Sequence, residues 1–199
     1  MQLREYCVEL ANSMHKNRKD SVCASLLDAG LLLALVRRLG SSDSSLCEDC
    51  AACIGYLTPF VDVMTITGMI DDAASRSGGD AGTLFLPFLS VLRSESDSRL
   101  LVGLLRVLKG VVEAGGKRRD DQGQNPHLVS LEGLGFSDAV IDLQSKSDKD
   151  KAVSEAALDA VLKCDILRMV SDGLMHENGT AAGSAARRLR RSLKAHVNE

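Results

Sequence analysis

Three cysteines, Cys47, Cys50 and Cys53, stand in a Cys-x-x-Cys-x-x-Cys run. This spacing resembles part of an iron–sulfur or zinc site. No fourth ligand lies nearby, and the third cysteine lacks the following proline of the bacterial cluster-binding run. Residues three apart share one face of a helix, so burial against a neighbouring helix is the favoured interpretation, with a metal site or a redox role as alternatives. We therefore expect no metal centre and no cofactor.

The other chemistry-bearing residues form no catalytic arrangement. The four histidines lack the short spacings of metal-binding pairs. The stretch from Gly110 to Lys117 resembles a phosphate-binding loop, but it is one residue too long and no Ser or Thr follows the lysine. Paired carboxylates lie in polar segments, and no nucleophile has a base that can be named. We predict that the protein is not an enzyme.

The composition favours helices. Of the 199 residues, 45% are hydrophobic and only 3% are aromatic, and there are three prolines. Strands favour aromatic and β-branched residues, so β-sandwiches and barrels are disfavoured. The net charge of −3 gives no reason to expect a polyanion as the main partner.

No segment of the sequence has the character of a membrane span or a secretory signal. The longest purely apolar run, Leu31 to Val36, has six residues, far fewer than the roughly 20 that cross a bilayer. The charged, amphipathic start of the chain does not resemble a secretory signal. We expect a cytoplasmic protein, with the nucleus as the alternative.

Apolar residues recur with helical period along most of the chain. Ser42 or Asp43 is expected to cap the helix that ends before Pro59. The expected helices cover residues 2–16, 22–27, 31–39, 46–57, 61–74, 84–92, 100–112, 128–134, 137–143, 149–162, 166–175 and 181–197.

These elements form a repeated pattern. A short helix, a glycine, a second helix, a Ser/Asp-rich break and a longer Ala-containing helix follow one another. The glycine junctions are expected at Gly30, Gly82 and Gly135, which are 52 and 53 residues apart. These intervals exceed the about 40–47 residues of a common helical repeat. The additional residues of each interval are expected in polar loops at about 75–81 and 114–126, which we expect to be mobile.

The segment from Asn12 to Val36 has a polar run, an Ala29-Gly30 junction and an apolar second helix, and it resembles armadillo (ARM/HEAT-like) repeats. The resemblance implies an all-α, right-handed α-solenoid of three to four armadillo-like repeats with irregular caps. Residues 169–178 also resemble small-GTPase dissociation-stimulator armadillo proteins. We expect a single domain over 1–199, with units at about 1–17 (partial), 20–58, 61–113, 125–163 and 165–197 (cap).

In the resembled family, the third helices of the repeats line a groove and often present an Asn that holds an extended peptide. Among the equivalent positions here only Asn12 keeps the amide, so capture of an extended peptide is not expected. The groove is instead small and largely apolar, which suits a partner's helix or folded surface. For each residue, packing against a neighbouring helix is the alternative. The expected groove residues are Asn12, Asp49, Tyr56, Gly103, Val107 and Ala160.

A basic segment near residue 190 is a second candidate surface. Arg187, Arg188, Arg191 and Lys194 share one face of the expected helix over 181–197. A solvated cap of the solenoid is the favoured interpretation, and an acidic protein surface or nucleic acid is the alternative partner. Sequence-specific nucleic-acid recognition is disfavoured because no aromatic residues lie among the cations.

We therefore expect a protein–protein interaction scaffold or adaptor that binds a helix or folded surface of a partner in the groove of its third helices. Two alternatives stay open. The resemblance also suggests a regulator of a small GTPase or a chaperone, acting as an exchange factor or cofactor. The basic helix suggests binding to nucleic acid or an acidic surface.

Overall fold

The structure is a computed structural model that describes residues 3–16, 25, 27, 29–76, 81–117, 125–146, 152, 153 and 156. Every regular element among these residues is an α-helix, which confirms the all-α prediction. The helices are α1 (Leu3–Lys16), α3 (Leu31–Arg38), α4 (Ser44–Leu57), α5 (Val63–Arg76), α6 (Ala81–Ser94), α7 (Ser98–Gly115), α8 (Pro126–Gly133) and α9 (Phe136–Lys146).

Short polar side chains start three of these helices. The Asp43 carboxylate accepts a hydrogen bond from the Leu46 N–H at 3.1 Å and caps α4. Asp97 caps α7 and Asn125 caps α8 in the same way. Each cap satisfies backbone donors that have no partner within the helix. The expectation of a cap at Ser42 or Asp43 is confirmed for Asp43.

Two of the three expected glycine junctions are built alike. Gly30 precedes α3 with φ of 91°, and Gly135 separates α8 from α9 with φ of 78°. This left-handed conformation favours glycine because it has no Cβ. Gly82, in contrast, lies inside α6, so its prediction as a junction is wrong. The connection between α5 and α6 falls at residues 77–80, outside the described part.

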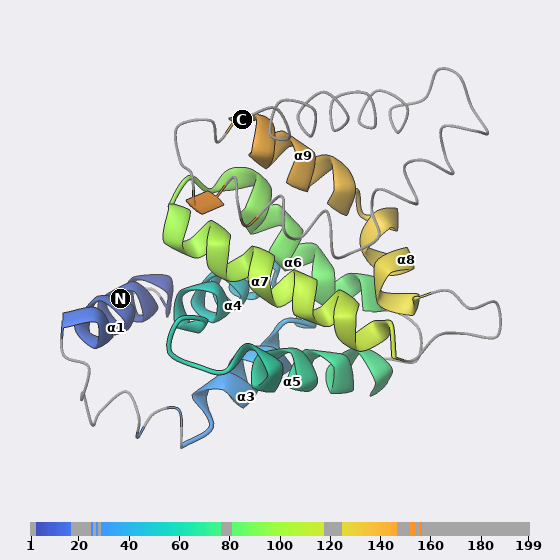
Figure 1. Ribbon diagram of the computed structural model, residues 1–199. Coiled ribbons are helices and arrows are strands. Elements are labelled where there is room, and N and C mark those ends of the chain that lie inside the picture. The colour runs from blue at the N-terminus through green and yellow to red at the C-terminus, as the bar shows by residue number, and fades with distance from the viewer. Residues whose placement is uncertain are drawn as a thin grey trace, which may run out of the picture.

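The helices α1, α4 and α7 lie side by side in that order, because α4 packs on both of the others (Figure 1). On one side of this row, α3 packs on α4 and on α5, and α5 packs on α7. On the other side, α6 packs on α4, α8 and α9. Each helix therefore covers an apolar stripe of the next.

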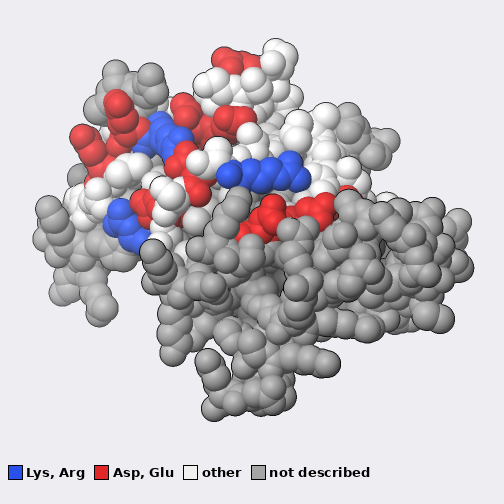
Figure 2. Space-filling view, turned by 90° about the horizontal axis from the view of Figure 1, so that it is seen from above, with Lys and Arg blue, Asp and Glu red and all other residues white. Residues whose placement is uncertain are grey.

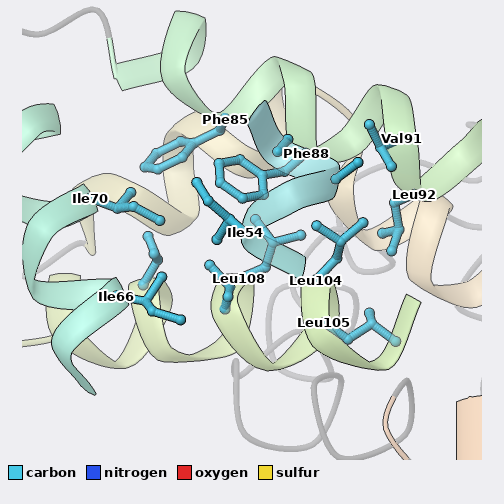
Figure 3. Close-up of a cluster of buried hydrophobic side chains, with 14 of the residues drawn as sticks. Ile54, Ile66, Ile70, Phe85, Phe88, Val91, Leu92, Leu104, Leu105 and Leu108 are labelled. Atoms are coloured by element: carbon cyan, nitrogen blue, oxygen red, sulfur yellow. The ribbon is translucent and has the colours of Figure 1, made fainter. Parts of the chain in front are cut away.

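One continuous core runs between these helices. In Figure 3, Phe85 and Phe88 of α6 lie against Ile54 of α4, with Leu104 and Leu108 of α7 beneath. Leu35 of α3 and Leu105 of α7 belong to this core and are 3% and 1% exposed. None of the helices in the described segments combines the length and apolar character that a bilayer span requires.

Candidate partner-binding surface

The cysteine run lies in the core. Cys47, Cys50 and Cys53 are 3%, 1% and 0% exposed, which confirms burial at a helix interface. The Cys47 thiol donates to two backbone carbonyls at 3.3 Å. Burial raises the pKa of Cys50 to about 11. No three metal-ligating side chains are grouped to hold an ion anywhere in the described ranges.

Two predicted groove residues, Asn12 and Tyr56, each form a hydrogen bond with a residue at the start of α7. Arg99 donates to Asn12 Oδ1 at 3.0 Å, and the Tyr56 hydroxyl donates to Asp97 Oδ2 at 3.0 Å. Burial raises the pKa of Tyr56 to about 12, and the hydrogen bond to Asp97 acts in the same direction. Both predicted residues are thus engaged within the chain, where they fasten α1 and α4 to α7.

Asp97 holds its charge in this network. Burial alone would raise its pKa, but hydrogen bonds from the Tyr56 hydroxyl and from the backbone N–H groups of Arg99 and Leu100 lower it below its usual value. Arg99 also forms an ion pair with Asp97 at 3.6 Å. The charged carboxylate therefore serves both as the cap of α7 and as the acceptor for α4.

Gly103 and Val107 do not line an open groove, so this part of the prediction is wrong. Val107 is 0% exposed, and Gly103 is buried where α7 crosses α4. A Cβ on Gly103 would lie 2.1 Å from the backbone oxygen of Gly55. The stripe assigned to the groove is therefore the stripe that α7 turns to its neighbours.

Of the remaining predicted residues, the structure describes only Asp49. Asp49 is half-buried on α4. Ala160 and the basic residues Arg187, Arg188, Arg191 and Lys194 lie outside the described residues.

The exposed side of α7 is displaced by one residue from the predicted stripe. We call it the α7 face, and its exposed or half-buried residues are Arg99, Val102, Arg106, Lys109 and Glu113. Steps of three and four place these residues along one side of the helix. The side chains of Arg99, Lys109 and Glu113 are 50%, 21% and 46% exposed. The recurrence of charged residues at this period in an apolar helix was the signal in the sequence.

Three of the five side chains on the α7 face are cations. Lys109 lies 4.0 Å from Glu113, so its charge is partly balanced. Arg106 is exposed and forms no ion pair or hydrogen bond with the described residues. In the view from above in Figure 2, the acidic and basic side chains of the described residues are intermixed. Among the described residues, the Arg106 guanidinium therefore has no acidic partner.

The described residues also form an open cleft of about 330 Å³ at the start of α3 and α5. Its lining includes the apolar residues Leu33, Phe60, Val61 and Met69 and the acidic residue Asp62. A cleft with these walls accepts an apolar side chain but holds few groups that would orient a polar ligand.

A buried polar pair joins α5 to α8. His127 Nε2 lies 2.7 Å from Asp71 Oδ1, and the two residues are 5% and 7% exposed. The Phe85 ring packs edge-on against the imidazole with centroids 5.5 Å apart. His127 Nδ1 is buried without a hydrogen-bond partner. Because the pair is closed to solvent, it acts as a link between helices. Sequence reasoning missed it because the partners are 56 residues apart.

No protein-family model, curated protein or solved structure significantly matches this chain. The candidate surface therefore rests on the residues and geometry described above.

Proposed function

We propose that the protein is a non-enzymatic scaffold of armadillo-like repeats that binds a partner protein through the α7 face. The order of packing supports the repeats: α1, α4 and α7 follow one another as third helices of successive units would. The matching left-handed glycines at Gly30 and Gly135 support the same assignment. Each unit leaves an apolar side that only the next unit covers, so stacking produces an extended surface.

The observation that carries the proposal is the α7 face itself. Arg106 extends from a helix whose other sides are buried, and it has no partner within the described residues. Val102, one turn earlier, supplies a half-buried apolar contact. An exposed cation beside an apolar residue fits a partner helix or folded surface that presents an acidic side chain.

The test reverses the charge of the α7 face. The variant Arg106→Glu with Lys109→Glu should recover about tenfold less partner than the wild type in affinity capture from native extract, which corresponds to about 1.4 kcal/mol. Quantitative mass spectrometry identifies and measures the captured protein. Circular dichroism shows whether the variant keeps its helices.

The matched control is Arg37→Glu with Arg38→Glu. These two exposed arginines lie on α3, which packs on α4 and α5, and the change in charge is the same. The control should capture the partner as the wild type does. Equal capture by both variants, or equal loss in both, would exclude the α7 face as the binding surface.

A further inference from the structure

Cys7 of α1 and Cys53 of α4 meet at the contact between these two helices. Both are 0% exposed and both are free thiols. Cys53 Sγ lies 3.8 Å from the carbonyl oxygen of Leu3. In an α-helix this carbonyl accepts the N–H of the residue four positions later, which is Cys7, and the Cys7 side chain points back over the same turn. The two thiols are therefore neighbours.

This contact holds the first helix to the rest of the protein. The main packing partner of α1 among the described helices is α4. Two polar contacts add to it, because Arg4 forms an ion pair with Glu95 and Asn12 accepts from Arg99. No covalent bond joins α1 to its neighbours while the thiols are reduced. A bond between Cys7 and Cys53 would change how readily α1 opens.

We propose that Cys7 and Cys53 are a disulfide-forming pair that a hydroperoxide oxidises, so that α1 becomes covalently fastened to α4.

The reaction has two steps. The Cys7 sulfur attacks one oxygen of the hydroperoxide and the O–O bond breaks, which gives a sulfenic acid and releases an alcohol, or water when the oxidant is hydrogen peroxide. The Cys53 sulfur then attacks the oxidised sulfur, the S–O bond breaks, and the hydroxyl leaves as water with the thiol proton. The two sulfurs lose two electrons in total, and the peroxide bond receives them.

The surroundings of the thiols assign their roles. Contact with the Cys53 side chain lowers the pKa of Cys7, and contact with Cys7 together with burial raises the pKa of Cys53. Cys7 is therefore the attacking thiol and Cys53 the resolving one. Because both are buried, the peroxide reaches them during local opening of α1.

The test treats the full chain with hydrogen peroxide under native conditions, blocks the remaining thiols and maps the cross-links by mass spectrometry. The expected product is a Cys7–Cys53 linked peptide pair that has lost two hydrogen atoms. Amide hydrogen exchange of α1 should slow several-fold in the oxidised protein, and dithiothreitol should restore the original rate. If the disulfide forms but the amide hydrogen-exchange rate of α1 does not change, the proposal that the disulfide fastens α1 to α4 is overturned.

Cys50→Ser is the matched control, because Cys50 lies one turn earlier on α4 and is equally buried. It should keep the cross-link and the slower exchange, whereas Cys7→Ser and Cys53→Ser should abolish both. If the serine variants fail to fold, the wild-type cross-link decides alone. The proposal is overturned if no Cys7–Cys53 link forms in the native protein, if Cys7 links to Cys50 instead, or if the link appears only in denaturant.

Discussion

Replacing Gly103 by alanine will force α4 and α7 apart. The new Cβ would lie 2.1 Å from the backbone oxygen of Gly55 and 2.9 Å from its carbonyl carbon. The shorter contact is 0.9 Å below the 3.0 Å limit that real Cβ atoms essentially never cross. Because the opposing atoms belong to the backbone, they cannot rotate aside as a side chain would. One helix must therefore shift and give up part of its packing.

Two opposing contributions set the size of the effect. Alanine favours the helix over glycine by about 1 kcal/mol. Overpacking a core costs about 1–3 kcal/mol and occasionally more, and rigid backbone on both sides places this site at the upper end. We expect a net loss of about 2 kcal/mol in the free energy of unfolding, which lowers the Tm of a domain of this size by about 4–8 °C.

Gly68→Ala is the matched control. Gly68 is exposed on α5, and a Cβ there would meet no atom within 4 Å. Only the helix preference acts at this position, so the variant should gain roughly 0.5–1 kcal/mol of stability. Thermal and urea unfolding followed by circular dichroism measure both variants. A Gly103→Ala protein that unfolds at or above the wild-type temperature would refute the close approach of α4 and α7.

Two further substitutions test the buried polar contacts. Tyr56→Phe removes the hydrogen bond to Asp97 and should cost about 1 kcal/mol at neutral pH. The pKa of Tyr56 is raised from 10.0 to about 12 on folding. The difference in free energy of unfolding between the wild type and the variant should therefore be largest below pH 10 and should decrease as the pH rises to about 12. A difference that stays constant across this pH range would contradict the hydrogen bond from Tyr56 to Asp97. Asp71→Ala leaves the His127 ring without its partner and should cost about 1–3 kcal/mol. The exposed Asp72→Ala on the same helix should change stability by less than about 0.5 kcal/mol, and equal melting of the two variants would argue against the pair.

The positions of the helices could be predicted because their signals are local. An apolar period and a capping carboxylate act within one helix and its flanks. The predicted ranges start too late where the first turn is polar: α4 begins at Ser44 and not at residue 46, and α7 begins at Ser98 and not at residue 100. In both helices the capping aspartate, and not the first apolar residue, determines where the helix begins.

The structure buries the stripe of α7 that was predicted to line the groove and exposes another side of the same helix. Helix α7 carries one stripe through Gly103 and Val107 and another through Arg99, Arg106 and Lys109. Periodicity separates the two stripes without saying what each one faces. The family resemblance assigned the first stripe to the groove, whereas burial of apolar area places it against α4 and the neighbouring helices.

The sequence by itself determined that the described part of the protein is helical, where most of its helices lie and how α4 is capped, because these properties depend on residues within a few positions of one another. The tertiary structure alone decided which helices meet. Gly103 against Gly55, His127 beside Asp71 and Cys53 beside Cys7 join residues far apart in the chain. Such pairs leave no local pattern, since the free energy that selects them comes from packing the whole core at once.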